Sequence, residues 1–236
     1  MNAWPSARQL VVDGYLLRAA GGPSRRVNSV NPLRGSGAPD PAVAACEAVY
    51  AGLGRRAIFR VPGLAPQMDP VLDRRGYGVE AESCTLFRDL AGIAPDPDAG
   101  VALTDGPTEA WLAARDAVSG ADPGAARAFR DAVALLALPR AFAVVSVAGG
   151  IGAIAFGVLD RSLVVLESVA TPEALRGRGH ARRAVSALMR WGRNRGAAGA
   201  CLQVQADNAS GRALYAGLGF ALELYRYHYR VRSGQG

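Results

Sequence analysis

Hydrophobic and polar positions repeat with two different periods along this chain. Alternation at every second residue, and short runs rich in Val, Ile, Phe and Tyr, indicate strands, whereas apolar positions three or four residues apart indicate helices. The segments typical of strands are 10–18, 28–33, 57–61, 79–88, 101–104, both arms of 141–159, 163–171, 201–206 and 220–232. The segments typical of helices are 41–52, 66–75, 107–118, 124–136, 180–195 and 209–216. Strands with helices between them predict an α/β fold of the α+β kind, built on a mixed sheet.

One segment, 141–159, carries no charge over a length that could span a bilayer. Ala148, Gly149 and Gly150 divide it into two short pieces, which predicts a buried hairpin rather than a transmembrane helix. The N-terminus lacks the basic stretch and apolar stretch of a signal peptide. We therefore expect a cytoplasmic protein with no membrane partner.

The best candidate linker is 91–100, where proline, glycine and aspartate cluster. It divides the chain into two predicted domains, 1–92 and 101–236. Half of the residues are hydrophobic and a fifth are charged, which indicates a folded globular protein rather than a disordered one.

Composition excludes several chemistries. All 27 basic residues are arginine, so Schiff-base formation, a pyridoxal phosphate anchor and a Walker A phosphate loop, which all need lysine, are excluded. Three cysteines without CxxC spacing and only two histidines argue against a disulfide framework and against a metal site.

The net charge of +7 is local, because the segment 176–195 holds seven arginines and no acidic residue. A short basic segment after a glycine-rich turn suits a compact polyanion such as a nucleotide phosphate better than a long nucleic acid. The turn 176–181, between a strand and a basic helix, has the features of a phosphate cradle. A dinucleotide-binding GxGxxG motif would need a third glycine where Arg182 stands.

Two sequence blocks resemble the GNAT N-acetyltransferases. The first matches the family's acyl-CoA motif, Arg/Gln-x-x-Gly-x-Gly/Ala, at Arg176, Gly179 and Ala181. The second is an asparagine at the head of a short helix, followed by Leu-Tyr and then Gly-Phe, and its residues are Asn208, Leu214, Tyr215, Gly219 and Phe220. The resemblance covers about residues 101–232 and implies the acyl-CoA N-acyltransferase fold.

The first half looks like a degenerate copy of the second. Segment 71–88 echoes 214–232, but Leu72 stands where Tyr215 would be, and the acyl-CoA turn is missing. The opening residues also look like the start of some bacterial two-unit GNAT proteins. The resemblance therefore implies two fused GNAT-like units, of which only the second binds a cofactor.

The resemblance implies an acyltransferase that uses acetyl-CoA as co-substrate, without a metal, to acetylate a primary amine by direct attack in a ternary complex. Amides near Val169 would polarise the acetyl carbonyl and the turn would hold the pyrophosphate. The residues expected to bind acetyl-CoA are Val169, Ala170, Thr171, Arg176, Gly177, Arg178, Gly179, His180, Ala181, Arg182, Asn208 and Tyr215.

Two residues are the candidates for catalysis. Tyr215 is expected to protonate the departing thiolate, although it could instead be a core aromatic. Glu167 lies among apolar residues of a strand, where a carboxylate is costly without a task or a partner. It is either the general base or a strand-end residue that meets solvent or an arginine. Asn208 shares a helix face with Tyr215 and either contacts the pantetheine arm or only caps the helix.

Polar residues suited to orienting a substrate concentrate near the N-terminus, at Arg26, Asn28 and Asn31. A well-capped loop would explain them equally well. Tyrosines 225, 227 and 229 alternate with His228 in the last strand, so one face of that strand could line an acceptor site.

Two other functions remain open at this point. A catalytically silent acyl-CoA-binding regulatory module would keep the cradle without turnover, and a nucleic-acid-binding protein would prefer DNA or RNA to CoA. The identity of the acceptor stays undetermined, and the chain could be a monomer or a homodimer.

Overall fold

The structure, a computed structural model, describes residues 2–93, 98 and 100–232. Within these residues eleven strands form one sheet in the order β1-β2-β3-β4-β11-β5-β10-β9-β8-β7-β6. The strands are β1 (Arg8–Val12), β2 (Tyr15–Ala19), β3 (Val30–Pro32), β4 (Ile58–Pro62), β5 (Tyr77–Asp89), β6 (Val101–Thr104), β7 (Arg140–Val147), β8 (Gly150–Asp160), β9 (Leu163–Ala170), β10 (Gly199–Gln205) and β11 (Leu222–Arg232).

Helices connect these strands, as the periodicity predicts. The α-helices are α1 (Pro39–Gly52), α2 (Asp69–Arg74), α3 (Glu109–Ser119), α4 (Pro123–Ala134), α5 (His180–Arg193) and α6 (Ala209–Gly217), and the short 3-10 helices are η1 (Arg25–Val27), η2 (Pro66–Met68) and η3 (Glu173–Leu175). Thr108 and Asp122 cap α3 and α4 by accepting hydrogen bonds from first-turn amides, which fixes where these two helices begin.

The expectation of one strand over 10–18 is wrong, because this segment is a hairpin. Val12 pairs with Tyr15 across a turn in which Asp13 and Gly14 have φ of 47° and 78°. An Asp-Gly pair is the favoured sequence for such a two-residue turn, since both positions need positive φ. The expected linker 91–100 lies partly outside the described residues. Within it, Asp98 forms an ion pair with Arg183 at 2.6 Å.

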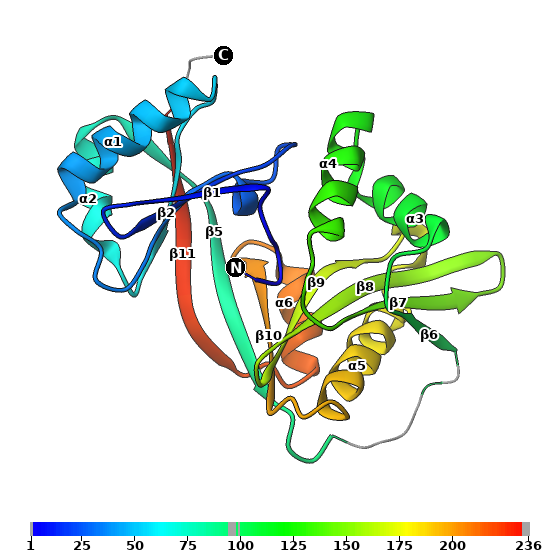
Figure 1. Cartoon of the computed structure of the whole chain (residues 1–236). Helices are drawn as coiled ribbons and strands as arrows, with labels where there is room; N and C mark the ends of the chain where they lie inside the picture. Colours follow the sequence, from blue (N-terminus) through cyan, green and yellow to red (C-terminus); the bar gives the residue numbers. More distant parts are fainter. Residues whose placement is uncertain (1, 94–97, 99, 233–236) are drawn as a thin grey trace.

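The helices cover both faces of the sheet in the second half. Helix α5 packs through residues such as Val185 and Leu188 on one face, and α6 lies on the same face through Tyr215. Helices α3 and α4 cover the opposite face, where Trp111 and Phe129 stack in the core. Figure 1 shows α5 and the pair α3 and α4 on opposite sides of β7 and β8. In the first half α1 and α2 pack on β2, β3 and β4.

The two halves of the chain interleave at the centre of the sheet. Strand β11, the last in the chain, lies between β4 and β5, and β5 lies between β11 and β10. Figure 1 shows β5 and β11 running side by side through the middle of the molecule. The segments 71–88 and 214–232 that echo each other in sequence therefore provide neighbouring antiparallel strands. In this comparison β4 corresponds to β10 and β5 to β11. Exchanging each strand for its counterpart gives the same order β4-β11-β5-β10 in reverse, as an internal repeat requires.

The uncharged segment 141–159 forms the predicted hairpin of β7 and β8, with its turn at Ala148 and Gly149. In the part of the chain that the structure describes, no helix is both long and apolar enough to cross a membrane.

Close packing of α5 on the sheet depends on a glycine. A Cβ at Gly192 would overlap Val164 of β9, whereas a Cβ at Gly52, the last residue of α1, would meet open space. We expect Gly192→Ala to lower the free energy of unfolding by about 1–3 kcal/mol. The control Gly52→Ala should leave it unchanged or raise it by up to about 1 kcal/mol. Urea unfolding of both variants measures the difference, and equal effects would contradict this packing.

Candidate active site

The site begins where β9 and β10 part. These parallel strands pair from Leu163 and Gly199 up to Leu166 and Leu202, and not beyond. Strand β10 continues beside β5 as far as Gln205, and β9 continues beside β8 as far as Ala170. Each strand thus keeps one neighbour while the two diverge, which opens a passage through the sheet.

A bulge in β9 lies at this opening. The register with β8 shifts between Glu167 and Ala170, and Ser168 has φ of 50°. A bulge adds one residue to a strand and so changes which face the following side chains meet. Leu166 packs towards α5, and so does Val169 three residues later, although strict alternation would put them on opposite faces. Glu167 lies in between and faces the other side of the sheet.

The opening holds a cavity of about 440 Å³. Both halves of the chain line it, since η1, β5 and β11 contribute residues beside those of β9, β10 and α6. Its lining residues are Pro23, Ser24, Arg25, Arg26, Ala81, Ser83, Leu166, Glu167, Ser168, Val169, Gln203, Val204, Gln205, Asn208, Tyr215, Tyr227 and Tyr229. Both candidate catalytic residues therefore line one cavity.

The Glu167 side chain is 7% exposed and forms an ion pair with Arg26. The pairing with an arginine is one of the alternatives expected for this residue, and its role as a general base stays a prediction. Burial is the largest single influence on the pKa of Arg26 and lowers it, but the charge and hydrogen bond of Glu167 together with nearby Tyr227 and Tyr229 raise the net pKa above its ordinary value. The guanidinium also lies over the ring of Trp4, with 5.6 Å between its central carbon and the ring centroid. The pair is thus held on a packed surface.

Tyr215 lies on α6, on the α5 face of the sheet. Its ring meets Phe220 edge-on, at 5.8 Å between centroids. Burial, and next the charge of Glu167, raises the pKa of this phenol to about 12. The hydroxyl is therefore protonated throughout the neutral range and can donate a proton.

Asn208 caps α6, because its side chain accepts a hydrogen bond from the Gly211 amide at 2.9 Å. It also lines the cavity. Capping explains its position without a ligand, and contact with a cofactor stays a prediction.

The glycine turn predicted to hold phosphate leads into α5. Gly177 and Gly179 have φ of 75° and 80°, and a Cβ on either would meet no atom within 4 Å. The first hydrogen bond of α5 runs from the Arg183 amide to the Gly179 carbonyl, at 3.1 Å. The amides that precede Arg183 in the first turn therefore have no acceptor within the helix. The turn is not part of the cavity lining. It lies one connection, 171–175, beyond the end of β9.

Several side chains of the basic segment serve the fold. Arg182 donates to the Gly217 carbonyl at 2.8 Å and Arg193 to the Leu90 carbonyl at 2.6 Å. Arg195 lies over the Trp191 ring, 4.9 Å from its centroid. His180 packs against Gly152 of β8. These contacts leave less of the segment available to a long nucleic acid than its charge alone indicates.

The structure brings together two of the three expected substrate residues. Arg26 and Asn31 both line a small cavity that includes Glu167, and Arg26 also lines the main cavity. Asn28 lies outside both. Its oxygen accepts a hydrogen bond from the Ala20 amide at 2.8 Å, and its nitrogen donates to the carbonyls of Gly22 and Ser24. Loop capping thus accounts for Asn28.

Sequence reasoning did not single out Gln203, Arg18 or Arg60, although each lies at the Glu167 side of the passage. Arg18 and Arg60 lie within apolar strands, the same signal that identified Glu167. Tyr227 and Tyr229, two residues apart in the last strand, both line the main cavity, and the expectation that this face lines an acceptor site stays a prediction. The Tyr227 hydroxyl donates to Gln203 Oε1 at 3.0 Å.

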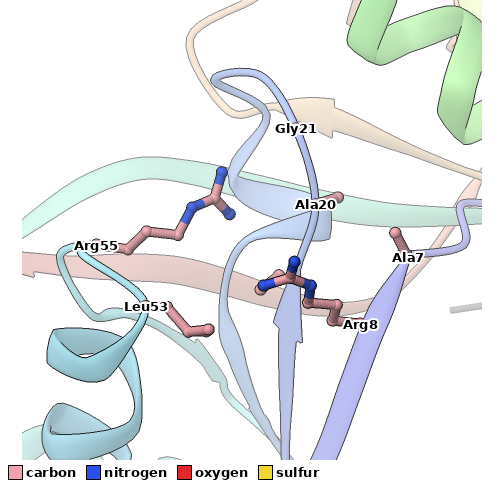
Figure 2. A pocket seen from close by; sticks show the side chains of 7 residues that line it. Ala7, Arg8, Ala20, Gly21, Leu53 and Arg55 are labelled. Carbon is pink, nitrogen blue, oxygen red and sulfur yellow. The ribbon is translucent and has the colours of Figure 1, made fainter.

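A separate hollow of about 280 Å³ lies between β1, β2 and the loop after α1. Figure 2 shows the guanidinium groups of Arg8 and Arg55 on its two sides. No carboxylate, imidazole or phenol is among its lining residues. It therefore lacks a group for proton transfer, and the active-site candidate stays at the strand opening.

The family described as "Probable histone acetyltransferase Rv0428c C-terminal" matches residues 1–232. The chain belongs to this family. No curated protein matches it. The likeness to two-unit GNAT proteins foreseen from the motifs is confirmed at the level of the family.

Solved GNAT structures share the fold of this family member. A GCN5-related N-acetyltransferase from Kribbella flavida is 18% identical with a TM-score of 0.68, over 97% of this chain and 91% of that one. A GNAT-family acetyltransferase from Novosphingobium aromaticivorans is 20% identical with a TM-score of 0.61, over 96% and 92%. A tandem GNAT protein from the clavulanic acid biosynthesis pathway is 13% identical with a TM-score of 0.62, over 83% and 70%. The fold is therefore the mixed α/β GNAT fold.

The raised pKa of Tyr215 predicts a loss of stability in alkali. In the unfolded chain a tyrosine ionises near pH 10, whereas folded Tyr215 keeps its proton to about pH 12. The free energy of unfolding should fall as the pH rises from 10 to 12, and this residue should account for roughly 2–3 kcal/mol of the fall. Tyr215→Phe should show a shallower fall, measured by urea unfolding at each pH. An equal slope in both proteins would contradict the burial of this phenol, and below pH 9 their difference should not depend on pH.

Proposed function

We propose that this GNAT protein is an N-acetyltransferase that transfers an acetyl group from acetyl-CoA to a primary amine by direct attack in a ternary complex. The observation that carries the proposal is the opening between β9 and β10, with a protonated phenol towards one face of the sheet and a buried carboxylate towards the other. Two reactants that enter from opposite faces would meet between Tyr215 and Glu167.

The residues on the α5 face fit acetyl-CoA. Gly177 and Gly179 leave open space over first-turn amides that have no acceptor within the helix, an arrangement that suits a pyrophosphate. Strand β9 has no ladder partner on its β10 side after Leu166, and the buried Thr171 hydroxyl has no partner among the described residues. The turn 176–182 would hold the pyrophosphate, residues 169–171 the thioester end and Asn208 the arm between them.

Acetyl-CoA, when bound, supplies an acetyl thioester whose carbon–sulfur bond breaks as the amine nitrogen bonds to the carbonyl carbon. Glu167 takes one proton from the amine, directly or through a water. Tyr215 gives its proton to the sulfur that leaves, which would otherwise depart as a thiolate with a pKa near 8.5. Both residues then exchange protons with solvent and return to their starting states.

The first half, 1–92, contributes to this site without a cofactor turn of its own. Leu72, at the position equivalent to Tyr215, lies on α2, is fully buried in the core of the first half and has no hydroxyl. Arg26 from the first half reaches Glu167 in the second. We therefore assign the cofactor to 101–236 and part of the acceptor side to 1–92.

A side chain in the glycine turn should block acetyl-CoA. We expect calorimetric titration to show binding to the unmodified protein and at least tenfold weaker binding to Gly179→Trp. The matched control is Gly196→Trp, because Gly196 also has positive φ, 88°, also faces open space and follows the other end of α5. Both substitutions carry the same backbone strain. Equal weakening in both variants, or no binding to the unmodified protein, would contradict the proposed cofactor site.

Loss of either proton-transfer group should slow turnover without removing the cofactor. We expect Tyr215→Phe and Glu167→Gln each to lower kcat for amine acetylation about 100-fold, measured by thiol release. Acetyl-CoA binding by calorimetry should remain within about threefold, which separates a chemical role from a folding defect. Unchanged turnover in both variants would contradict these proton-transfer roles, and acetyl-CoA binding without turnover by the unmodified protein would point instead to a binding module.

A further inference from the structure

On the face of the sheet opposite α5, space continues outward from Glu167. A small cavity of about 60 Å³ includes Glu167, Gln203 and Arg26 in its lining, and these residues also line the main cavity. A larger one of about 650 Å³ shares Asn31, Arg60 and Gln203 with the small cavity. A ligand could therefore extend from the proposed reaction centre through the small cavity into the larger one.

Three of the residues that line the small cavity carry buried donors without acceptors. The two terminal nitrogens of Arg18 donate to the carbonyls of Trp4 and Arg26, while its Nε has no partner. The Nε of Arg60 and the indole nitrogen of Trp4 are likewise buried and without a partner among the described residues. All three groups are N–H donors, so the missing partner is an acceptor of hydrogen bonds.

The small cavity also has an excess of positive charge, which likewise indicates that an anionic or acceptor group is missing. Three guanidinium groups, of Arg18, Arg26 and Arg60, line it with one carboxylate, Glu167, which is already paired with Arg26. Neither Arg18 nor Arg60 forms an ion pair within residues 2–93, 98 and 100–232. Arg18 is 3% exposed, and burial lowers its pKa to about 10, which keeps it cationic at neutral pH. Buried charges are costly unless a counterion meets them, and among the residues that the structure describes no carboxylate pairs with Arg18 or Arg60.

We infer that the acceptor of the proposed acetyl transfer is an amino acid, with a carboxylate that binds between Arg60, Arg18 and the Trp4 indole. This inference rests on the proposed function and names its substrate class. A carboxylate is a flat acceptor that matches the paired donors of guanidinium groups. In an amino acid the amine is attached to the carbon beside the carboxylate, so the amine lies towards Glu167.

The larger cavity specifies the rest of the acceptor. Its lining includes Leu33, Pro62, Leu64 and Ala65, which favour an apolar side chain. Arg60 is held in position by the Tyr227 ring, 3.8 Å from its central carbon, and by the Tyr225 hydroxyl at 3.4 Å. A lysine-rich protein segment would bring positive charge to a cavity that already has an excess of it. The site therefore favours apolar amino acids over polycationic acceptors.

The test compares matched acceptors. The probes are L-leucine and L-phenylalanine, their carboxamides, and a lysine-rich peptide, assayed by thiol release with saturating acetyl-CoA. We expect at least tenfold higher kcat/KM for the amino acids than for the carboxamides, through KM. Carboxamide amines are the weaker bases and are more often unprotonated, so intrinsic reactivity would favour the opposite order. Equal or better use of the carboxamides or the peptide overturns the inference.

Variants of Arg60 test whether this residue causes the preference for amino acids over their carboxamides. Arg60→Gln should abolish the preference, and Arg60→Lys should retain part of it. The control Arg161→Gln changes a side chain that is 89% exposed and should leave the preference intact. A readout without turnover is calorimetric binding of N-acetyl-L-leucine and its carboxamide to the protein with CoA. The carboxylate form should bind at least tenfold more tightly, and only when Arg60 is present. If acetyl-CoA binds but no amino acid is bound or acetylated, this inference fails alone, whereas absence of acetyl-CoA binding is the failure of the proposed function.

Discussion

The parting of β9 from β10 is the constraint on which the site depends. When two parallel strands separate, each loses its backbone hydrogen bonds on the side that faced the other. Each stays in the sheet only if it remains paired on its opposite side. Here β9 remains paired with β8, and β10 remains paired with β5. The bulge at Ser168 has a positive φ that costs of order 1 kcal/mol or more in a non-glycine residue. This strain is maintained by the packing of α5 on one face and of α3 and α4 on the other, and its effect is to turn Glu167 and Val169 to opposite sides.

The neighbour that β10 keeps comes from the other half of the chain, so the exchange of strands at the centre and the opening of the site are one arrangement. Because β5 lies beside β10 and β11 beside β4, the tyrosines of β11 face the same space as Arg60 of β4 and Gln203 of β10. The first half has no cofactor turn, yet the ion pair between Arg26 and Glu167 crosses between the halves. The first half therefore contributes residues to the cavity at Glu167 although it has no glycine turn like that of the second half.

Local patterns predicted most elements, since periodicity and turn residues act over a few positions. A charge within an apolar strand needs a partner or a task, and this argument selects Glu167 from the sequence. The same argument applied to Arg18 and Arg60 predicts the residues of the small cavity, and the Asp13-Gly14 pair likewise predicts a turn. The sequence does not predict the exchange of strands between the halves, because alternation in β11 is the same whichever strands flank it. The neighbours of Glu167 could not be predicted either, since they depend on which distant strands pair.

The use of arginine rather than lysine in this chain has a physical consequence at the buried cation Arg18. Burial disfavours the charged form of any base, and a deeply buried lysine can lose its proton near neutral pH. Arginine begins from a much higher pKa, so the burial of Arg18 lowers its pKa to about 10 and still leaves a cation. Its planar group can also donate to two main-chain carbonyls while keeping Nε for another partner. A permanently positive, geometrically fixed group beside Glu167 is thus available only to arginine, and such a group can orient an anion without competing for the proton that Glu167 is proposed to take.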